Sequence, residues 1–283
     1  MSATAEPTAV RGLLDRAFPP PRLSPDEAAV LAALQRALDE EVEPLAAEHD
    51  ERGRYPRLAV NALRPTGILS ASLPRDLGGG GASHRLTLEA QVRMAAADSS
   101  VAQVFRVHED SVRELHVFAD EAQRERLSEL IVDQQAILGL AAAENGRRVD
   151  SPMTTLAHRQ PDGSYVIDGR KIYATGSAGA DMVIVAAFDP VAGAGDPLLG
   201  VKSFLVAPDA PGVTMHLDWD ALGQRATESG TVTFDGVRVA PPDGPFVATG
   251  LLSQSGPRFQ AGFAAELVGI GIAAVRAAAP FVA

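Results

Sequence analysis

The first half of the chain carries apolar residues at helical spacing. A strong start signal lies at residues 24–27, where Ser24 can cap a helix and Glu27 can complete a capping box. Apolar residues follow at helical spacing, at Val30, Leu31, Leu34 and Leu38. This pattern predicts a helix to about His49. Similar patterns predict further helices at Pro56–Pro65, after a cap at Ser83, at Ser99–Phe118 and after a cap at Asp120.

From Ile137 onward the pattern changes to short apolar runs with strand character. The predicted strands are Thr154–Arg159, Tyr165–Asp168, Met182–Phe188, Lys202–Val206, Val213–Leu217 and Thr231–Phe234. Turn signals such as Pro161-Asp162-Gly163 and Asp235-Gly236 separate them. Many short strands with short turns predict an antiparallel barrel or sandwich. Helical texture returns near Pro257 and continues to the end.

These patterns predict an α+β protein with four segments. We expect a flexible N-terminus at 1–22, a helical N-terminal domain at 23–136, a β-barrel middle domain at 137–250 and the start of a second helical domain at 251–283. This order does not suggest a Rossmann fold, which needs alternating strands and helices. The apolar stretch Phe259–Ala283 contains Glu266 and Arg276, so we interpret it as a buried helix rather than a membrane span.

Charge and cysteine content narrow the classes of partner. The chain has 25 basic and 36 acidic residues and a formal net charge of -11, so it repels nucleic-acid phosphates and anionic lipid. We expect neither nucleic acid nor membrane as a partner. The absence of cysteine excludes disulfides and thiolate nucleophiles, and it fits a cytoplasmic protein. The six histidines show no metal-ligand spacing, so no metal site is expected.

The segment 168–181 carries the most informative chemistry. Lys171, the aromatic Tyr173 and the hydroxyl of Thr175 lead from a predicted strand into a loop of small residues. Small residues let a planar ligand approach the backbone closely. Thr175 could then hydrogen-bond the edge of a heterocycle and Tyr173 could stack on its face. Taken alone, the same segment also fits an ordinary hairpin.

This segment resembles the middle domain of acyl-CoA dehydrogenase-like flavoproteins, where a Gly-x-Lys-x-aromatic-x-Ser/Thr stretch lines the flavin ring. Two further segments agree. Residues 139–146 lie where the family has a Thr-Glu-Pro-type flavin loop, and residues 218–239 look like the signature that closes the barrel. The resemblance covers about residues 24–283. It implies an N-terminal helical domain, a middle antiparallel β-barrel and only the first helix of a C-terminal helical bundle, so we expect a C-terminally truncated chain.

Within the superfamily, the stretch 218–230 is most similar to reduced-flavin monooxygenases of the dibenzothiophene monooxygenase group. Asn145 stands where a typical dehydrogenase has proline, and an amide can donate a hydrogen bond there. Dehydrogenases of the family need a glutamate base, one position for which is just before an arginine. Here Pro257 precedes Arg258, and the other family position would lie beyond Ala283.

The resemblance also implies roles for individual residues. His108 would be the catalytic acid/base, since imidazole titrates near neutral pH. Asn145 and Thr175 would position the flavin, and Tyr173 and Trp219 would wall its pocket. Arg225 would bind cofactor or form a structural ion pair of the barrel. The alternative for His108 is a surface helix histidine paired with a neighbouring carboxylate, Glu109 or Asp110.

The favoured hypothesis is thus a two-component monooxygenase that uses reduced flavin and dioxygen on a small apolar or organosulfur substrate. We expect FMN rather than FAD, a separate flavin reductase as partner and a homo-oligomer at full length. One alternative is an FAD-dependent acyl-CoA dehydrogenase whose base lies on missing sequence. Another is a catalytically silent, truncated relative.

Overall fold

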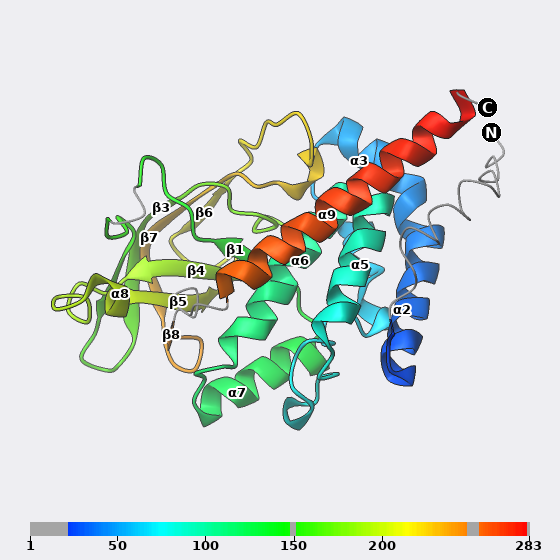
Figure 1. Ribbon diagram of the computed structural model, residues 1–283. Helices are drawn as coiled ribbons and strands as arrows, with labels where there is room; N and C mark the ends of the chain where they lie inside the picture. The colour runs from blue at the N-terminus through cyan, green and yellow to red at the C-terminus, as the bar shows by residue number, and fades with distance from the viewer. Residues whose placement is uncertain (1–21, 148–150, 248–254, 282–283) are drawn as a thin grey trace.

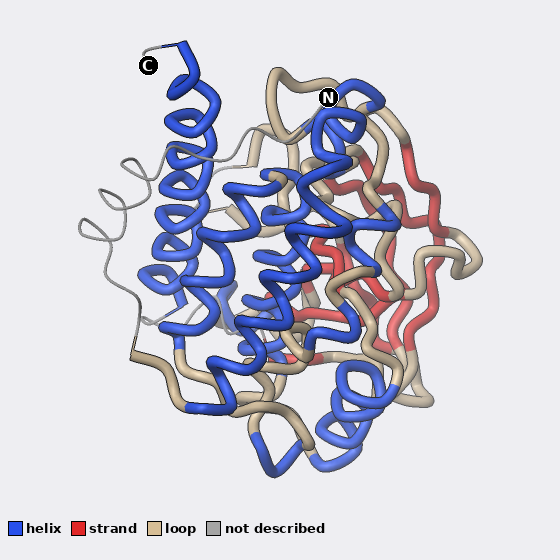
Figure 2. The backbone as a smooth tube through the Cα atoms, turned by 90° about the vertical axis from the view of Figure 1, so that its right-hand side faces the viewer, coloured by secondary structure: helices blue, strands red, loops and turns tan. Residues whose placement is uncertain are grey.

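Helices form one side of the molecule and a curled sheet forms the other (Figures 1 and 2). The computed structural model describes residues 22–147, 151–247 and 255–281. The expected flexible N-terminus therefore lies outside the described residues, apart from Arg22. The helical segments extend to Asp133 and the first strand begins at Leu138, so the change in sequence texture at Ile137 coincides with the change in structure.

The first helix begins where its capping signal lies. α2 (Pro25–Ala37) starts after Ser24, and the side chains of Ser24 and Glu27 form the reciprocal capping box. The chain is helical to His49 and beyond, as predicted, but not as one regular α-helix. After α2 the helix widens into a π-helical turn at Leu38–Val42 and then tightens into a 3₁₀ turn at Glu43–Leu45. The α-helical geometry resumes in α3 (Ala46–Arg52). Pro44, which has no amide hydrogen to continue the ladder, lies in this break.

The other helices of this side follow the predicted pattern with shifted ends. They are α4 (Arg57–Asn61), α5 (His84–Ala97), α6 (Ser99–Leu115) and α7 (Glu121–Ser128). Asp98 caps α6, and Asp120 forms a capping box with Gln123 at α7. Ser83 does not cap α5 through its side chain. Its amide and hydroxyl instead donate to the carboxylate of Glu27, which ties α5 to α2.

The sheet contains the predicted strands and two that the sequence did not indicate, β1 and β8. The strands are β1 (Leu138–Ala141), β2 (Leu156–Arg159), β3 (Tyr165–Lys171), β4 (Met182–Phe188), β5 (Val201–Val206), β6 (Val213–His216), β7 (Thr231–Val239) and β8 (Phe246–Val247). Their order is β6-β7-β3-β2-β4-β5-β8, with β1 pairing β4 beside this path. The short helix α8 (Pro197–Gly200) precedes β5.

The predicted α+β architecture is confirmed, but the middle domain is a mixed sheet rather than an antiparallel barrel. β1 runs parallel to β4, with Leu138 opposite Met182, and β2 also meets β4 in parallel at Leu156 and Phe188. The other pairings are antiparallel. Parallel neighbours need a long connection, which the residues between β1 and β4 supply. The result is a curled, mixed sheet, a half-barrel against the helices.

The central strand β4 explains how the two sides share one core. Every residue of β4 is buried. Val183, Val185 and Ala187 pack on the inner side of the sheet, whereas Met182 and Ile184 pack toward the helices. Because alternate side chains of a strand point to opposite faces, a strand covered on both faces reads as a continuous apolar run.

The last helix, α9 (Ser255–Ala278), crosses α5 and α6 and continues past them (Figure 1). The expectation that it is buried is wrong for its outer side, where Leu267 and Val275 are 68% and 51% exposed. By length and composition alone, Gly256–Phe281 could also cross a membrane. On its inner side, α9 meets α5 at Gly269, where an added Cβ would collide with the carbonyl oxygen of Val92.

We therefore predict opposite effects for two glycine substitutions in α9. Gly269→Ala should lower the free energy of unfolding by about 1–3 kcal/mol, since it forces α9 away from α5. Gly271→Ala is the matched control, because a Cβ there meets no atom within 4 Å and alanine favours the helix by up to about 1 kcal/mol. Thermal unfolding of both variants tests this. Equal effects of the two substitutions would show that the crossing is not tight.

Candidate functional site

Two segments far apart in sequence lie side by side at the edge of the sheet. Leu140 forms an isolated bridge with Thr175, and Ala143 forms another with Ile172. The amide of Leu140 donates to the carbonyl of Thr175 at 3.1 Å. The loop that follows β1 and carries the exposed Asn145 is thereby held beside the end of β3. The bridges place Thr175 opposite Leu140 rather than Asn145, so a shared flavin contact of Asn145 and Thr175 stays a prediction.

Tyr173 and Trp219 form an aromatic corner beside these segments. Their ring centroids are 5.9 Å apart in an edge-to-face arrangement. Tyr173 is 62% exposed and has a φ of 52°, a left-handed backbone conformation that is uncommon for a residue with a bulky side chain. Such strain persists only where the surroundings enforce it, and it is concentrated at functional sites. The corner thus presents an accessible aromatic surface at a strained position.

A chain of hydroxyl groups lies behind the aromatic corner. The hydroxyl of Thr175 contacts that of Ser229 at 3.0 Å, and Ser229 contacts the hydroxyl of Thr227 at 2.7 Å. Thr227 donates to the carbonyl oxygen of Gln224, which also accepts the indole N–H of Trp219 at 3.0 Å. Thr175 and Trp219 are therefore joined through one backbone carbonyl. These three hydroxyl residues are buried, whereas Tyr173 and Asn145 are exposed.

A buried ion pair anchors the loop of Asn145 to the sheet. The Lys171 ammonium donates to the Glu144 carboxylate at 2.7 Å, and both side chains are almost wholly buried. Glu144 also accepts from the amides of Thr154 and Thr155. Burial raises the pKa of Glu144, but the hydrogen bonds from Lys171 and these amides outweigh it and lower the pKa to about 2. The ion pair therefore holds Glu144, the residue before Asn145, against the sheet.

His108 lies inside the molecule rather than on its surface. Its side chain is fully buried, its Nε2 lies 2.9 Å from the carbonyl oxygen of Leu69, and the amide of Leu138 donates to its Nδ1 at 3.2 Å. These partners fit a neutral ring with the hydrogen on Nε2. Burial lowers the pKa of His108 to about 4. This geometry supports a structural role, and the catalytic role of His108 stays a prediction.

The side chain of Arg225 contacts the helical side of the molecule. Its Nε donates to the carbonyl oxygen of Asp50, near the end of α3, at 2.9 Å. The side chain also lies against Gly53, which has a left-handed φ of 58°. This contact joins the loop to the helical side through a backbone carbonyl and not through the ion pair that the sequence left open. A cofactor contact of Arg225 stays a prediction.

The sequence reasoning missed a buried polar cluster beneath this loop. Glu266 of α9 is 2% exposed, and its carboxylate accepts a hydrogen bond from the side-chain amide of Gln224. Its other oxygen lies 3.5 Å from the guanidinium of Arg106, which stacks on Phe263. The single acidic residue of this mostly apolar helix was the signal that could have revealed it, because buried carboxylates need partners.

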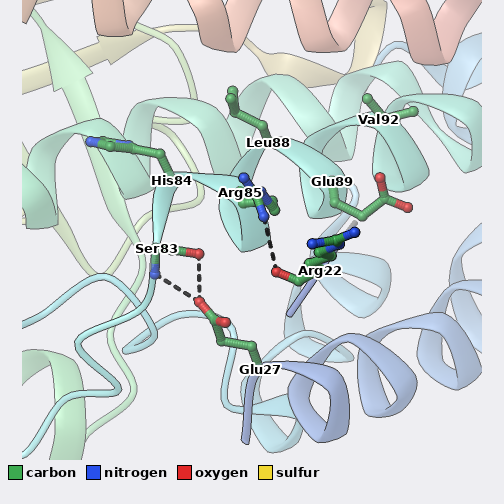
Figure 3. Close-up of a pocket in the computed structure, with 8 residues that line it drawn as sticks. All are labelled: Arg22, Glu27, Ser83, His84, Arg85, Leu88, Glu89 and Val92. Carbon is green, nitrogen blue, oxygen red and sulfur yellow. Dashed lines mark hydrogen bonds between the residues drawn. The ribbon is translucent and has the colours of Figure 1, made fainter. Parts of the chain in front are cut away.

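Figure 3 shows a separate surface pocket that shares no residue with this site. It lies at the start of α5, where Ser83 binds Glu27 and Arg85 donates to the carbonyl of Arg22. Ser83, Glu27 and Arg85 of its lining are thus engaged in contacts between α2, α5 and the preceding residues. Within the described part of the chain, no group of three or more histidine and acidic side chains is arranged to hold a metal ion.

Comparison with known proteins places this geometry in a family. The acyl-CoA dehydrogenase N-terminal domain matches residues 24–135, and the acyl-CoA dehydrogenase middle domain matches residues 138–237. A dibenzothiophene monooxygenase from Mycolicibacterium goodii is 30% identical over 253 residues, which are 86% of this chain. The match covers 60% of that relative, so the chain spans well under two thirds of its length.

Two other relatives support the same branch. A protein named "Probable FMNH2-dependent monooxygenase SfnC" from Pseudomonas putida is 32% identical over 207 residues, covering 73% of this chain and 49% of the relative. The crystal structure of FMN-bound TdsC from Paenibacillus sp. A11-2 superposes with a TM-score of 0.79 and 30% identity. That superposition covers 89% of this chain and 64% of TdsC.

The His108 geometry predicts a loss of stability in acid. Because the folded pKa of about 4 lies below the unfolded value of about 6.5, the unfolded state binds more protons between these pH values. The stabilisation is complete above about pH 6.5 and falls by about 3 kcal/mol as the pH drops to 4. His108→Gln should flatten this dependence, and the exposed His158→Gln should not. Urea unfolding from pH 7 to pH 4 measures it. Parallel wild-type and His108→Gln curves would contradict the assignment.

The buried ion pair predicts a second effect on stability. Lys171→Met leaves the Glu144 carboxylate buried without its cation and should cost about 3–5 kcal/mol in the free energy of unfolding. Adding Glu144→Gln should recover part of that loss, because the remaining group is then uncharged. Lys202→Met, on a less buried part of β5, is the control. The prediction is wrong if Lys171→Met and Lys202→Met unfold at the same urea concentration.

Proposed function

The chain belongs to the acyl-CoA dehydrogenase family, and from this membership we propose that it serves a two-component monooxygenase that uses reduced flavin. The observation that supports it most is the exposed ring of Tyr173, which stands edge-to-face with Trp219 on a backbone of strained, left-handed conformation. Aromatic faces with uncharged hydrogen-bonding groups suit a planar heterocycle. The loop of small residues after Thr175 lets such a ring approach the backbone.

In this proposal each residue of the site has a defined task. The Thr175 hydroxyl and the Asn145 amide hydrogen-bond the edge of the flavin, and Tyr173 and Trp219 wall its pocket and exclude water. A bound reduced flavin supplies the activation of dioxygen, whereas the protein supplies orientation and a dry environment. Arg225 contributes by holding the loop of Trp219 against α3. His108 either handles a proton or, as its buried contacts favour, secures the junction behind the site.

The relatives' names guide the finer part of the proposal. Because TdsC binds FMN and SfnC is named as FMNH2-dependent, FMN is the proposed cofactor, and FAD is the alternative. A protein that takes up reduced FMN needs a flavin reductase as partner. The dibenzothiophene monooxygenase relative favours a small apolar or organosulfur substrate. A homo-oligomer in the cytoplasm completes the proposal.

Flavin titration tests the proposal directly. We expect the 283-residue protein to bind FMN saturably, and Thr175→Val to weaken binding by about threefold to tenfold, as expected for one lost hydrogen bond. Thr214→Val, at an exposed position of β6, should leave the affinity unchanged. Flavin fluorescence and anaerobic titration of reduced FMN are the measurements.

The outcomes separate the candidate functions. Oxygen consumption by reduced flavin on the protein supports the monooxygenase, whereas rapid flavin reduction by an acyl-CoA supports the dehydrogenase alternative. The absence of saturable binding of FMN and FAD, oxidised or reduced, would contradict the proposed flavin site and favour the catalytically silent relative.

A further inference from the structure

The loop that carries Trp219 depends on one backbone carbonyl, that of Gln224. This oxygen accepts the indole N–H of Trp219 and the hydroxyl of Thr227. Thr227 in turn contacts Ser229, whose hydroxyl reaches Thr175. The orientation of the Gln224 peptide therefore sets the position of one wall of the proposed pocket and of its hydroxyl chain.

Gln224 adopts a conformation that its own side chain does not favour. Its φ of 51° and ψ of 39° lie in the left-handed region, which residues other than glycine, asparagine and aspartate rarely occupy. Such a conformation needs support from outside the loop. The contact that supplies it is the hydrogen bond from the Gln224 side-chain amide to the carboxyl of Glu266.

Glu266 reaches this loop from α9, which the chain forms after the whole sheet. The carboxyl lies between Gln224 and Arg106 of α6, whose guanidinium also approaches Asp110 at 3.4 Å. Gly269, one turn further along α9, allows the close crossing with α5 that brings Glu266 inward. The far oxygen of Glu266 has no hydrogen-bond partner among the described residues. The close contact of this carboxyl is thus with Gln224 and not with Arg106.

We propose that Glu266 is a positioning residue, which accepts the amide of Gln224 and thereby holds the Trp219 wall of the pocket in place. The description of Trp219 as a flavin wall rests on the proposed function, whereas the link from Glu266 to Trp219 does not. The role requires an acceptor oxygen rather than a charge. Burial raises the pKa of Glu266 to about 7 against the lowering effects of Arg106 and Gln224.

The two roles open to Glu266 predict different rankings of variants. If Glu266 positions Gln224, Glu266→Gln keeps an acceptor oxygen and preserves the loop, whereas Glu266→Leu releases it. If Glu266 serves only as counter-ion to Arg106, the two variants remove the same charge and have equal effects. Gln224→Leu removes the donor from the opposite side. Leu267→Ala, at a 68% exposed neighbouring position, is the control on α9.

Trp219 reports the result without any flavin, because it is the single tryptophan of the chain. We expect Glu266→Leu and Gln224→Leu to shift the Trp219 emission to longer wavelength and to raise its quenching by acrylamide. Glu266→Gln and Leu267→Ala should match the wild-type protein. The double variant should resemble either leucine variant alone, as coupled residues do. Circular dichroism checks that each variant is folded. If Glu266→Leu does not fold, Gln224→Leu alone tests the proposal.

An unchanged Trp219 in folded Glu266→Leu or Gln224→Leu overturns the proposal, and so does a Glu266→Gln variant that behaves like Glu266→Leu. FMN titration then separates this inference from the proposed function. If both hold, the two leucine variants bind FMN about tenfold more weakly, the factor that corresponds to 1.4 kcal/mol. If wild-type protein binds no flavin while Trp219 responds as expected, the positioning role stands and the proposed function fails.

Discussion

The junction between the helices and the sheet depends on one buried imidazole. His108 lies on α6, contacts the carbonyl of Leu69 on the helical side and accepts the amide of Leu138 at the start of β1. Two backbone groups that would otherwise be buried without partners are thus satisfied by one neutral side chain. Because β1 is aligned on β4 from Leu138 onward, this contact also sets where the loop of Asn145 begins.

The candidate site is built on that junction and stores backbone strain. Tyr173, Gln224 and Glu228 all have left-handed conformations, and all lie in the two segments that form the aromatic corner and its support. Contacts from elsewhere in the fold support each: the bridges of Ile172 and Thr175 on either side of Tyr173, the side chain of Glu266 for Gln224, and the ion pair of Glu228 with Arg54. The local sequence disfavours these conformations, so the surrounding tertiary structure has to maintain them.

The two sides of the last helix, α9, have different roles, which the composition of the helix does not distinguish. Its inner side places Glu266 against Gln224 and crosses α5 at Gly269, whereas its outer side leaves Leu267 and Val275 exposed. An apolar helix of this kind is stable only where neighbours cover it. The described residues cover the inner side, and the chain spans 60% of the length of its dibenzothiophene monooxygenase relative.

The sequence by itself determined the helices and most strands, and it predicted the segments of the candidate site through the family resemblance. Capping boxes at Ser24 and Asp120 and the apolar run of β4 are local signals, since hydrogen bonds within a few residues and side-chain alternation produce them. Only the tertiary structure decided the parallel pairing of β1, the burial of His108 and the contact of Glu266 with Gln224. Those depend on groups 30 or more residues apart, whose meeting leaves no periodic pattern in the chain.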